Sequence, residues 1–272
     1  MMKYKNIIIL SVLLFSFMTV SFDIFSSPIQ SSIVIDANTG KILHSYNADK
    51  IVYPASLTKM MTLYVTFAGL QKGLFKIEDN LLISKKASKQ PRTKIGLIAG
   101  DNISIDTAIK ALIIKSANDV ATVLAENISI SETEFAKLMT KIAVDLGMEN
   151  TVFKNASGLN NILQQTTAGD MAILMMALQQ HFPEYYKYFS VKNFKYKNET
   201  FYSYNRIINQ YDGVDGIKTG YIDESGFNLI VSVKKGKDRI IAVLFGAKSQ
   251  LDRDREMKQL LDYGFIMLNN EH

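Results

Sequence analysis

The sequence predicts an α/β (α+β) fold, in which strands from both ends of the chain form one antiparallel sheet and a mainly helical region is inserted between them. Two patterns support this prediction: strand-like segments occur near the N-terminus and again in the last third of the chain, and helical segments lie between them. With 272 residues, 47% of them hydrophobic, the chain can bury a sizeable core. The simplest arrangement places helices on the faces of the sheet.

The first elements follow from local patterns. Residues 31–36 and 41–46 flank an Asn-Thr-Gly turn, which predicts a β-hairpin. After Pro54, residues 56–71 form a strongly apolar segment, which predicts a helix that ends near Gly73. Further helices are predicted over residues 104–115, 120–126, 131–146 and 167–180.

The last third of the chain changes character. Residues 216–221, 227–233 and 239–245 are predicted as strands, joined by turns that contain Gly, Lys and Asp. Residues 251–268 have apolar side chains at helical spacing and predict a closing helix. These strands provide the second half of the predicted sheet.

The N-terminus has the pattern of an export signal. Lys3 and Lys5 precede residues 7–22, an apolar run of about 16 residues that only small hydroxyl side chains interrupt. The run is near the lower length limit for spanning a bilayer, so it could be cleaved or kept as an anchor. We therefore predict that residues 1–27 are a signal peptide or an uncleaved N-terminal anchor, and that residues 28–272 form one domain outside the cytoplasmic membrane.

Composition excludes several classes of function. The net charge of +5 comes from scattered lysines without a recognisable reading element, so no nucleic-acid partner is predicted. The chain has no cysteine, which excludes a cysteine nucleophile, thiolate metal sites and disulfides. A His-Glu-x-x-His sequence and a phosphate-binding Gly-Lys loop are also absent, so no metal or organic cofactor is expected.

Histidine is an unpromising general base in this chain. The three histidines are His44, His181 and His272, and none lies in a motif. A Ser-His-Asp triad is therefore not expected, which leaves lysine as the candidate base.

Ser56 and Lys59 form the first candidate pair. Three residues apart on a helix, they would lie on one face, with about 5–6 Å between their Cβ atoms. Pro54 fixes the start of the helix, where free N–H groups and the positive end of the dipole favour a developing anion. Taken alone, the pair is more simply explained as a helix cap with a solvated lysine, because Ser-x-x-Lys recurs by chance, as in residues 232–235.

Two later tripeptides also carry useful chemistry. In Ser116-Ala117-Asn118, a hydroxyl can relay a proton and an amide can hold a peptide carbonyl. In Lys218-Thr219-Gly220, an amine and a hydroxyl can bind a carboxylate, and glycine lets a substrate approach the backbone. Each alone is equally consistent with an ordinary turn.

Together, and in this order, the three motifs are the signature of penicillin-binding proteins and class A β-lactamases. The chain resembles the low-molecular-mass penicillin-binding proteins, specifically the serine-type D-Ala-D-Ala carboxypeptidase family. The resemblance extends to residues 56–62, 215–221 and 254–265, and covers about residues 30–268, the family's whole catalytic domain. Many members have Arg where this chain has Gly169, before Asp170. Many also have a second, β-rich domain and a C-terminal amphipathic anchor, so here the N-terminal run is the expected means of membrane association.

The resemblance implies the penicillin-binding-protein/β-lactamase-like fold and a reaction. Ser56 would attack the carbonyl between the two terminal D-alanines of a peptidoglycan stem peptide, and water would then hydrolyse the acyl-enzyme. Lys59 would be the general base, with a pKa lowered by the like charge of Lys218 and by partial burial. β-Lactam antibiotics would bind at the same serine. The expected location is the periplasm or the outer face of the cytoplasmic membrane.

The resemblance also implies roles for other residues. Ser116 would relay a proton to the departing amine, and Asn118 would orient the peptide. The substrate's terminal carboxylate would bind Lys218 and Thr219, with Arg255 reinforcing it and Arg206 as a further candidate. The backbone N–H groups of Ser56 and Tyr221 would form the oxyanion hole, beside Gly220. Alternatively, Arg255 is a surface residue that pairs with Glu256 or Asp252.

Three other functions share parts of this pattern. A serine β-lactamase would need a Glu on a loop between the second and third motifs, and no Glu-x-x-Leu-Asn occurs there. A non-catalytic penicillin-binding sensor would usually have several membrane spans, whereas this chain has one apolar run. An esterase or amidase with the same Ser-Lys pair stays open.

Overall fold

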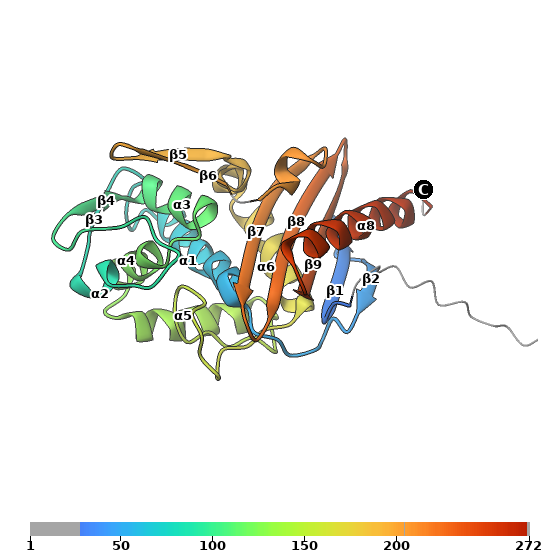
Figure 1. Ribbon diagram of the computed structural model, residues 1–272, viewed down its shortest axis with the longest axis horizontal. Coiled ribbons are helices and arrows are strands. Elements are labelled where there is room, and N and C mark those ends of the chain that lie inside the picture. The colour runs from blue at the N-terminus through green and yellow to red at the C-terminus, as the bar shows by residue number, and fades with distance from the viewer. Residues whose placement is uncertain (1–27, 204, 271–272) are drawn as a thin grey trace, which may run out of the picture.

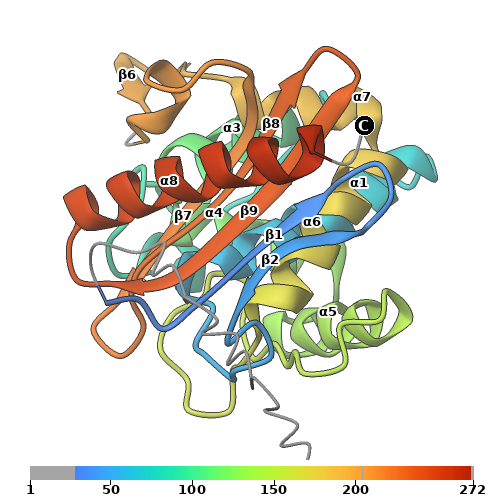
Figure 2. The same cartoon turned by 90° about the vertical axis from the view of Figure 1, so that its right-hand side faces the viewer.

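The computed structural model describes residues 28–203 and 205–270, so the predicted export signal lies outside the described residues. Its centre is a five-stranded antiparallel sheet in the order β2-β1-β9-β8-β7. The strands are β1 (Ser31–Asp36), β2 (Ile42–Tyr46), β7 (Val214–Ile222), β8 (Gly226–Lys235) and β9 (Asp238–Ala247). Since β1 pairs with β9, the sheet is assembled from both ends of the chain, and the predicted fold class is confirmed (Figure 2).

One helix covers each face of this sheet. Figure 2 shows α8 (Gln250–Asn269) lying across the near face and α6 (Ala168–His181) behind the sheet. Strand β9 is buried on both sides, as its side chains alternate between the two cores. Residues 241, 243 and 245 pack in the cluster that contains α6, and residues 240, 242 and 244 pack in the cluster that contains α8.

A mainly helical region lies beside the sheet (Figure 1). It contains α1 (Lys59–Gln71), α2 (Lys85–Ser88), α3 (Ile105–Ile114), α4 (Asn118–Ile128), α5 (Glu132–Asp145) and the short strands β3 (Asn80–Leu82) and β4 (Asn102–Ser104). Helix α1 contacts α4 and α5 of this region and also α6, which covers the sheet, and it is buried over most of its length. Its N-terminal end therefore lies at the boundary between the two parts.

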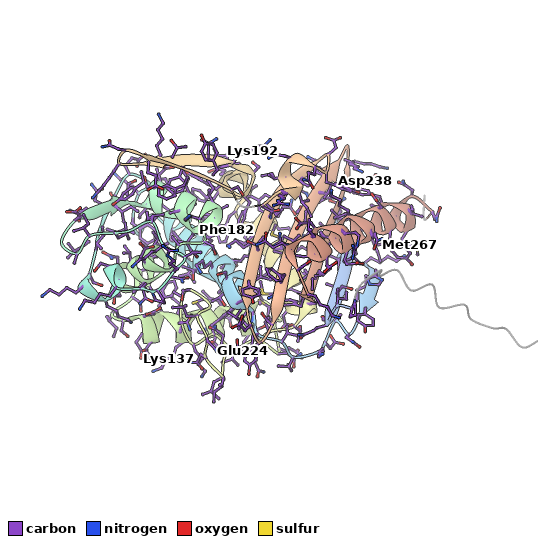
Figure 3. All side chains as sticks on the ribbon, in the orientation of Figure 1. Lys137, Phe182, Lys192, Glu224, Asp238 and Met267 are labelled. Carbon is purple, nitrogen blue, oxygen red and sulfur yellow. The ribbon has the colours of Figure 1, made fainter. Side chains whose placement is uncertain are left out.

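Aromatic side chains join these parts. Phe182, labelled in Figure 3, follows α6 and meets two rings of α1 edge-on. Its ring centroid lies 4.8 Å from that of Tyr64 and 6.0 Å from that of Phe67. Such pairs add about 0.5–1.5 kcal/mol beyond their buried area, so they fix α1 against the sheet.

Side-chain caps explain where several helices begin. The hydroxyls of Ser104, Ser131, Thr167 and Ser249 each accept a hydrogen bond from the backbone N–H three residues later. A cap of this kind contributes about 1 kcal/mol. Five of the six predicted helix starts were accurate to within two residues, and the sixth, predicted at residue 56, lies in a 3-10 turn three residues before α1.

Some short elements were not predicted. They are η1 (Ala55–Thr58), α7 (Pro183–Tyr186), η2 (Lys187–Ser190), η3 (Ile207–Asn209), a hairpin of β5 (Asn193–Tyr196) and β6 (Glu199–Tyr202), and the elements α2, β3 and β4 named above. The nucleophile helix thus begins with a 3-10 turn that contains Ser56, and α1 proper begins at Lys59. Within residues 28–203 and 205–270, no helix has both the length and the apolar character needed to cross a bilayer.

Candidate active site

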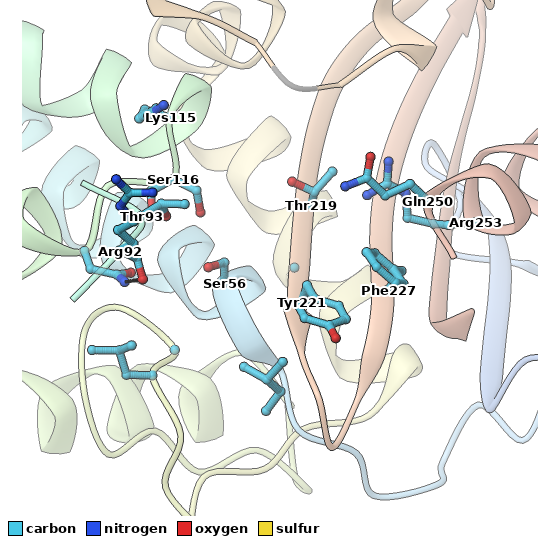
Figure 4. A pocket seen from close by; sticks show the side chains of 15 residues that line it. Ser56, Arg92, Thr93, Lys115, Ser116, Thr219, Tyr221, Phe227, Gln250 and Arg253 are labelled. Carbon is cyan, nitrogen blue, oxygen red and sulfur yellow. Dashed lines mark hydrogen bonds between the residues drawn. The ribbon is translucent and has the colours of Figure 1, made fainter. Parts of the chain in front are cut away.

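A cavity of about 470 Å³ lies where the sheet edge meets the helical region. Figure 4 shows its two walls on either side of Ser56. The wall from the helical region carries Arg92, Thr93, Lys115 and Ser116, and the wall from the sheet and α8 carries Thr219, Tyr221, Phe227, Gln250 and Arg253. The loop that follows α5 adds Gly158 and Leu159.

Lys59 lies directly against the candidate nucleophile. Its Nζ is 3.1 Å from Ser56 Oγ, so the two side chains share one face as their spacing predicted. The same amine donates to Asn118 Oδ1 at 2.8 Å and to the carbonyl of Ser157 at 2.5 Å. Because these partners hold Lys59 in place, it can exchange a proton with Ser56 without moving.

The pKa of Lys59 is well below the ordinary lysine value. Complete burial is the main cause, and the nearby charge of Lys218 lowers it further, while Asp119 opposes the shift. Asp119 is itself held by the backbone N–H groups of residues 95–97, which approach its carboxylate at 3.0–3.3 Å. The lowered pKa favours the neutral amine, which is the form that can serve as a base.

Lys218 is a second buried amine in the same site. Burial lowers its pKa to about 7. Its Nζ donates to Ser116 Oγ at 2.8 Å and to the carbonyl of Thr219 at 3.0 Å. The third motif on β7 is therefore joined to the second motif, although 102 residues separate them.

The backbone is strained at two of the motifs. Ala55, before the nucleophile, and Ser116 have φ values of 47° and 56°, in the left-handed region that residues with a Cβ rarely adopt. A Cβ added at Gly158 would lie 1.8 Å from the carbonyl oxygen of Ala55, so only glycine fits beneath that turn. Thr93 Oγ1 donates to the carbonyl of Ser116 at 2.7 Å and holds the second strained residue. Strain of this kind is concentrated at functional sites.

Gly220 lets strand β7 approach the nucleophile. A Cβ at this position would lie 3.3 Å from the backbone nitrogen of Ser56 and 3.2 Å from the carbonyl oxygen of Pro54. Any larger residue would therefore push the strand away. The absence of a side chain places the start of the nucleophile turn against the backbone just before Tyr221.

The arginines differ from the sequence prediction. Arg253 lies at the cavity, whereas Arg255 and Arg206 line a separate hollow on the outer side of α8. Arg255 pairs there with Asp252 at 2.7 Å and Glu256 at 3.2 Å, the surface alternative considered above. Two residues along a helix turn the side chain by about 200°, so Arg253 and Arg255 face opposite sides.

The sequence contained a signal for this correction. Arg253 lies four and seven residues before the buried Met257 and Leu260, and so shares the apolar face of α8. Arg255 does not share that spacing. By contrast, we find no sequence pattern that would have identified Arg92, Lys115 or Leu159 as cavity residues.

The described residues define the chemistry that the site can perform. No carboxylate lines the cavity among them, and no group of three His, Cys, Asp or Glu side chains within residues 28–203 and 205–270 could hold a metal ion. A serine hydroxyl beside a buried lysine, with cationic groups across the cavity, is the arrangement that serine acyl transfer with a lysine base requires.

Comparison with known proteins agrees with this class. Residues 20–249 match the peptidase family S11, described as D-alanyl-D-alanine carboxypeptidase, and the chain belongs to that family. It is 36% identical over 245 residues to D-alanyl-D-alanine carboxypeptidase DacF of Bacillus subtilis, an alignment that covers 87% of this chain and 62% of that protein. The chain thus spans about three fifths of the length of the curated relatives that it matches.

Solved structures show the same fold. Penicillin-binding protein 5 of Haemophilus influenzae has a TM-score of 0.85 and 33% identity, covering 88% of this chain and 71% of that one. Penicillin-binding protein D2 of Listeria monocytogenes, crystallised in an ampicillin-bound form, has a TM-score of 0.76 and 27% identity, covering 87% of this chain and 97% of that one. The predicted penicillin-binding-protein-like fold is confirmed.

Proposed function

We propose that this protein is a serine-type D-alanyl-D-alanine carboxypeptidase, which removes the terminal D-alanine from peptidoglycan stem peptides through an acyl-enzyme on Ser56. The observation that carries the proposal is the joining of three distant motifs in one cavity. Lys59 contacts Ser56 and Asn118, and Lys218 contacts Ser116. The family membership supports the same reaction.

In the acylation step, neutral Lys59 accepts the proton of Ser56 Oγ as this oxygen attacks the carbonyl carbon of the penultimate D-alanine. The negative charge that develops on the carbonyl oxygen is stabilised by the backbone N–H groups of Ser56 and Tyr221, and one such donor is typically worth about 2.7–4 kcal/mol. The C–N bond then breaks. The leaving nitrogen takes, through the Ser116 hydroxyl, the proton that Lys59 accepted from Ser56, while Ser116 Oγ keeps its hydrogen bond from Lys218, which retains its own proton.

In the deacylation step, Lys59 is again neutral after its proton has left with D-alanine. It takes a proton from water, whose oxygen attacks the ester carbonyl and releases Ser56. Lys59 is the only basic side chain within hydrogen-bonding distance of Ser56 Oγ among the residues that the structure describes. One lysine thus acts as the base in both steps.

Substrate binding divides between the two walls. Lys218, Thr219 and Arg253 bind the terminal carboxylate, and Arg253 takes the role first expected of Arg255. Asn118 orients the peptide and also fixes the site, because its amide accepts from Lys59 and donates to the backbone carbonyls of Pro91 and Arg92 at 3.2 and 3.0 Å. Gly220 admits the backbone of β7 to the reacting carbonyl.

The location and the inhibitors follow from the same proposal. The N-terminal signal or anchor would export the domain to the periplasm or the outer face of the cytoplasmic membrane, with membrane association through that segment. β-Lactams would acylate Ser56, and the ampicillin-bound form of the Listeria relative supports this. Neither a cofactor nor a nucleic acid takes part.

Two alternatives predict different products. A β-lactamase would turn over a chromogenic cephalosporin many times per second, but no described carboxylate lines the cavity to activate water, so we expect a long-lived adduct instead. A sensor would form the adduct without ever releasing D-alanine. The test is D-alanine release from a pentapeptide ending in D-Ala-D-Ala, with Ser56→Ala as the control. Cephalosporin turnover, or labelling without D-alanine release, would overturn the proposal.

A further inference from the structure

A second hollow continues the active-site cavity towards the β5–β6 hairpin. Its volume is also about 470 Å³, and Arg92, Thr93 and Lys115 line both spaces. The remaining lining residues are Lys94, Ile95, Gly96, Glu199 and Phe201. We call this second space the basic groove, since three of its eight lining residues are cations and one is an acid.

Two cations of the basic groove, Arg92 and Lys94, can pair with a charged ligand. Among the residues that the structure describes, no carboxylate forms an ion pair with Arg92 or Lys94. Lys115 Nζ lies over the ring of Phe201, 5.6 Å from its centroid, which holds the lysine stem against the hairpin. Glu199, on the same hairpin, is the only opposing charge among the lining residues.

The segment that carries these cations is tied to the catalytic motif. The backbone N–H of Asn118 donates to the carbonyl of Thr93 at 2.7 Å, and its side-chain amide donates to the carbonyl of Arg92. Two consecutive residues of the groove are therefore held by a residue that also contacts Lys59. A ligand group bound there would have a fixed position relative to Ser56.

We infer that the basic groove binds a second carboxylate of the peptide substrate, on a residue before the two D-alanines. This inference rests on the proposed function. The terminal carboxylate has its own partners on the sheet wall, Thr219 and Arg253, and Figure 4 shows Arg92 and Lys115 on the other side of Ser56. An extended peptide covers about 3.3–3.6 Å per residue, so two or three residues are enough to pass from Ser56 into the groove.

The inference names a chemical preference. A stem peptide in which glutamate is linked through its side chain keeps a free α-carboxylate, and amidation removes that charge without changing the shape. Charge-assisted hydrogen bonds from arginine and lysine would favour the carboxylate form. Because the groove is open to solvent, the preference should weaken as salt is added.

The experiment compares two pentapeptides that differ only in a carboxylate or a carboxamide on the second residue. Both end in D-Ala-D-Ala, and D-alanine release gives a KM for each. The readout is the KM of the carboxamide peptide divided by the KM of the carboxylate peptide. For the wild type, we expect a KM that is roughly 3–10-fold lower for the carboxylate, the range of one or two partly exposed ion pairs. The ratio should fall towards one in Arg92→Gln and Lys94→Gln, and rise in Glu199→Gln.

A matched control separates the groove from the general charge of the protein. Lys141 on α5 is 70% exposed and lies outside both spaces, so Lys141→Gln should leave the ratio unchanged. Equal KM values for the two peptides, or a ratio that Lys141→Gln lowers as much as Lys94→Gln does, would overturn the inference while D-alanine release continues. Absence of D-alanine release from both peptides would instead count against the proposed function.

Discussion

The two walls of the cavity are built in different ways. The sheet wall consists of a regular antiparallel ladder, where β7 pairs with β8, and of the first turn of α8. The helical wall and the nucleophile turn contain two left-handed residues, Ala55 and Ser116, and the fully buried Lys59. In the proposed function the two walls therefore have different roles: regular structure would hold the substrate carboxylate, and strained, desolvated structure would hold the reacting groups.

The two buried lysines show the same division. Burial lowers the pKa of both lysines, to about 7 for Lys218, and at Lys59 the charge of Lys218 adds to the effect of burial while Asp119 opposes it. Lys59 can then act as the neutral base, whereas Lys218 keeps part of its charge at pH 7 and can bind an anion. The two amines are distinguished by their surroundings alone.

The largest expected effect comes from removing the proposed base beside Ser56. Lys59→Met keeps most of the length of the side chain and removes the amine, so Ser56 loses its base. We expect acylation by a β-lactam and D-alanine release to fall by about 10²–10⁴-fold, the usual contribution of general base catalysis. Stopped-flow acylation rates measure this loss, and a variant that still acylates within tenfold of the wild type would contradict the assignment.

The second prediction tests the sheet wall, which is proposed to bind the substrate carboxylate, by making the same substitution at two neighbouring arginines. Arg253→Gln should raise KM for the pentapeptide by about 10–100-fold, because a hydrogen bond to a charged group contributes about 1.5–3 kcal/mol. Arg255→Gln faces the outer hollow and should change KM by less than about twofold. Steady-state D-alanine release provides both values. The reverse order would restore the original assignment to Arg255.

A third prediction uses pH to sharpen the comparison of the lysines. Lys218 is charged below its pKa of about 7 and neutral above it, so carboxylate binding should weaken as pH rises and KM should increase above pH 7. Lys218→Arg keeps its charge at every accessible pH. In this variant the rise of KM above pH 7 should therefore be absent or should begin at a much higher pH. A wild-type KM that stays flat between pH 6 and 9 would argue against this role.

The smallest predicted effect concerns the strained turn. Gly158→Ala would place a methyl group against the carbonyl of Ala55, whereas Gly40, which also has a positive φ of 77°, has nothing within 4 Å of its would-be Cβ. Both substitutions carry a backbone cost of about 1–2 kcal/mol. Only Gly158→Ala should also lower the acylation rate, by a few-fold, because it displaces the turn that contains Ser56. Thermal melting and acylation rates together separate the two effects.

The sequence predicted the parts of this site that depend on order and local pattern. The hairpin of β1 and β2, the nucleophile helix and the three motifs could be recognised because each has short-range signals: turn residues, a helix start, or a tripeptide in the expected context. The antiparallel sheet followed from the positions of these strands at both ends of the chain.

Other features depend on long-range packing and could not be predicted. The left-handed Ala55 lies against Gly158, about a hundred residues later in the chain, and the partners of Asp119 are backbone groups of a loop without a motif. The β5–β6 hairpin has short strands and a Lys-Asn turn, which give a weak signal. The choice between Arg253 and Arg255, by contrast, was open to prediction, because the helical phase of α8 places only Arg253 on its apolar face although both lie in one run of charged residues.

The most direct test of the central claim is mass spectrometry of the protein after treatment with penicillin. The wild type should gain the mass of one opened β-lactam, and peptide mapping should place it on Ser56. Ser56→Ala should gain none while melting at the wild-type temperature. A penicillin adduct on another residue, or one that survives in Ser56→Ala, would contradict the account.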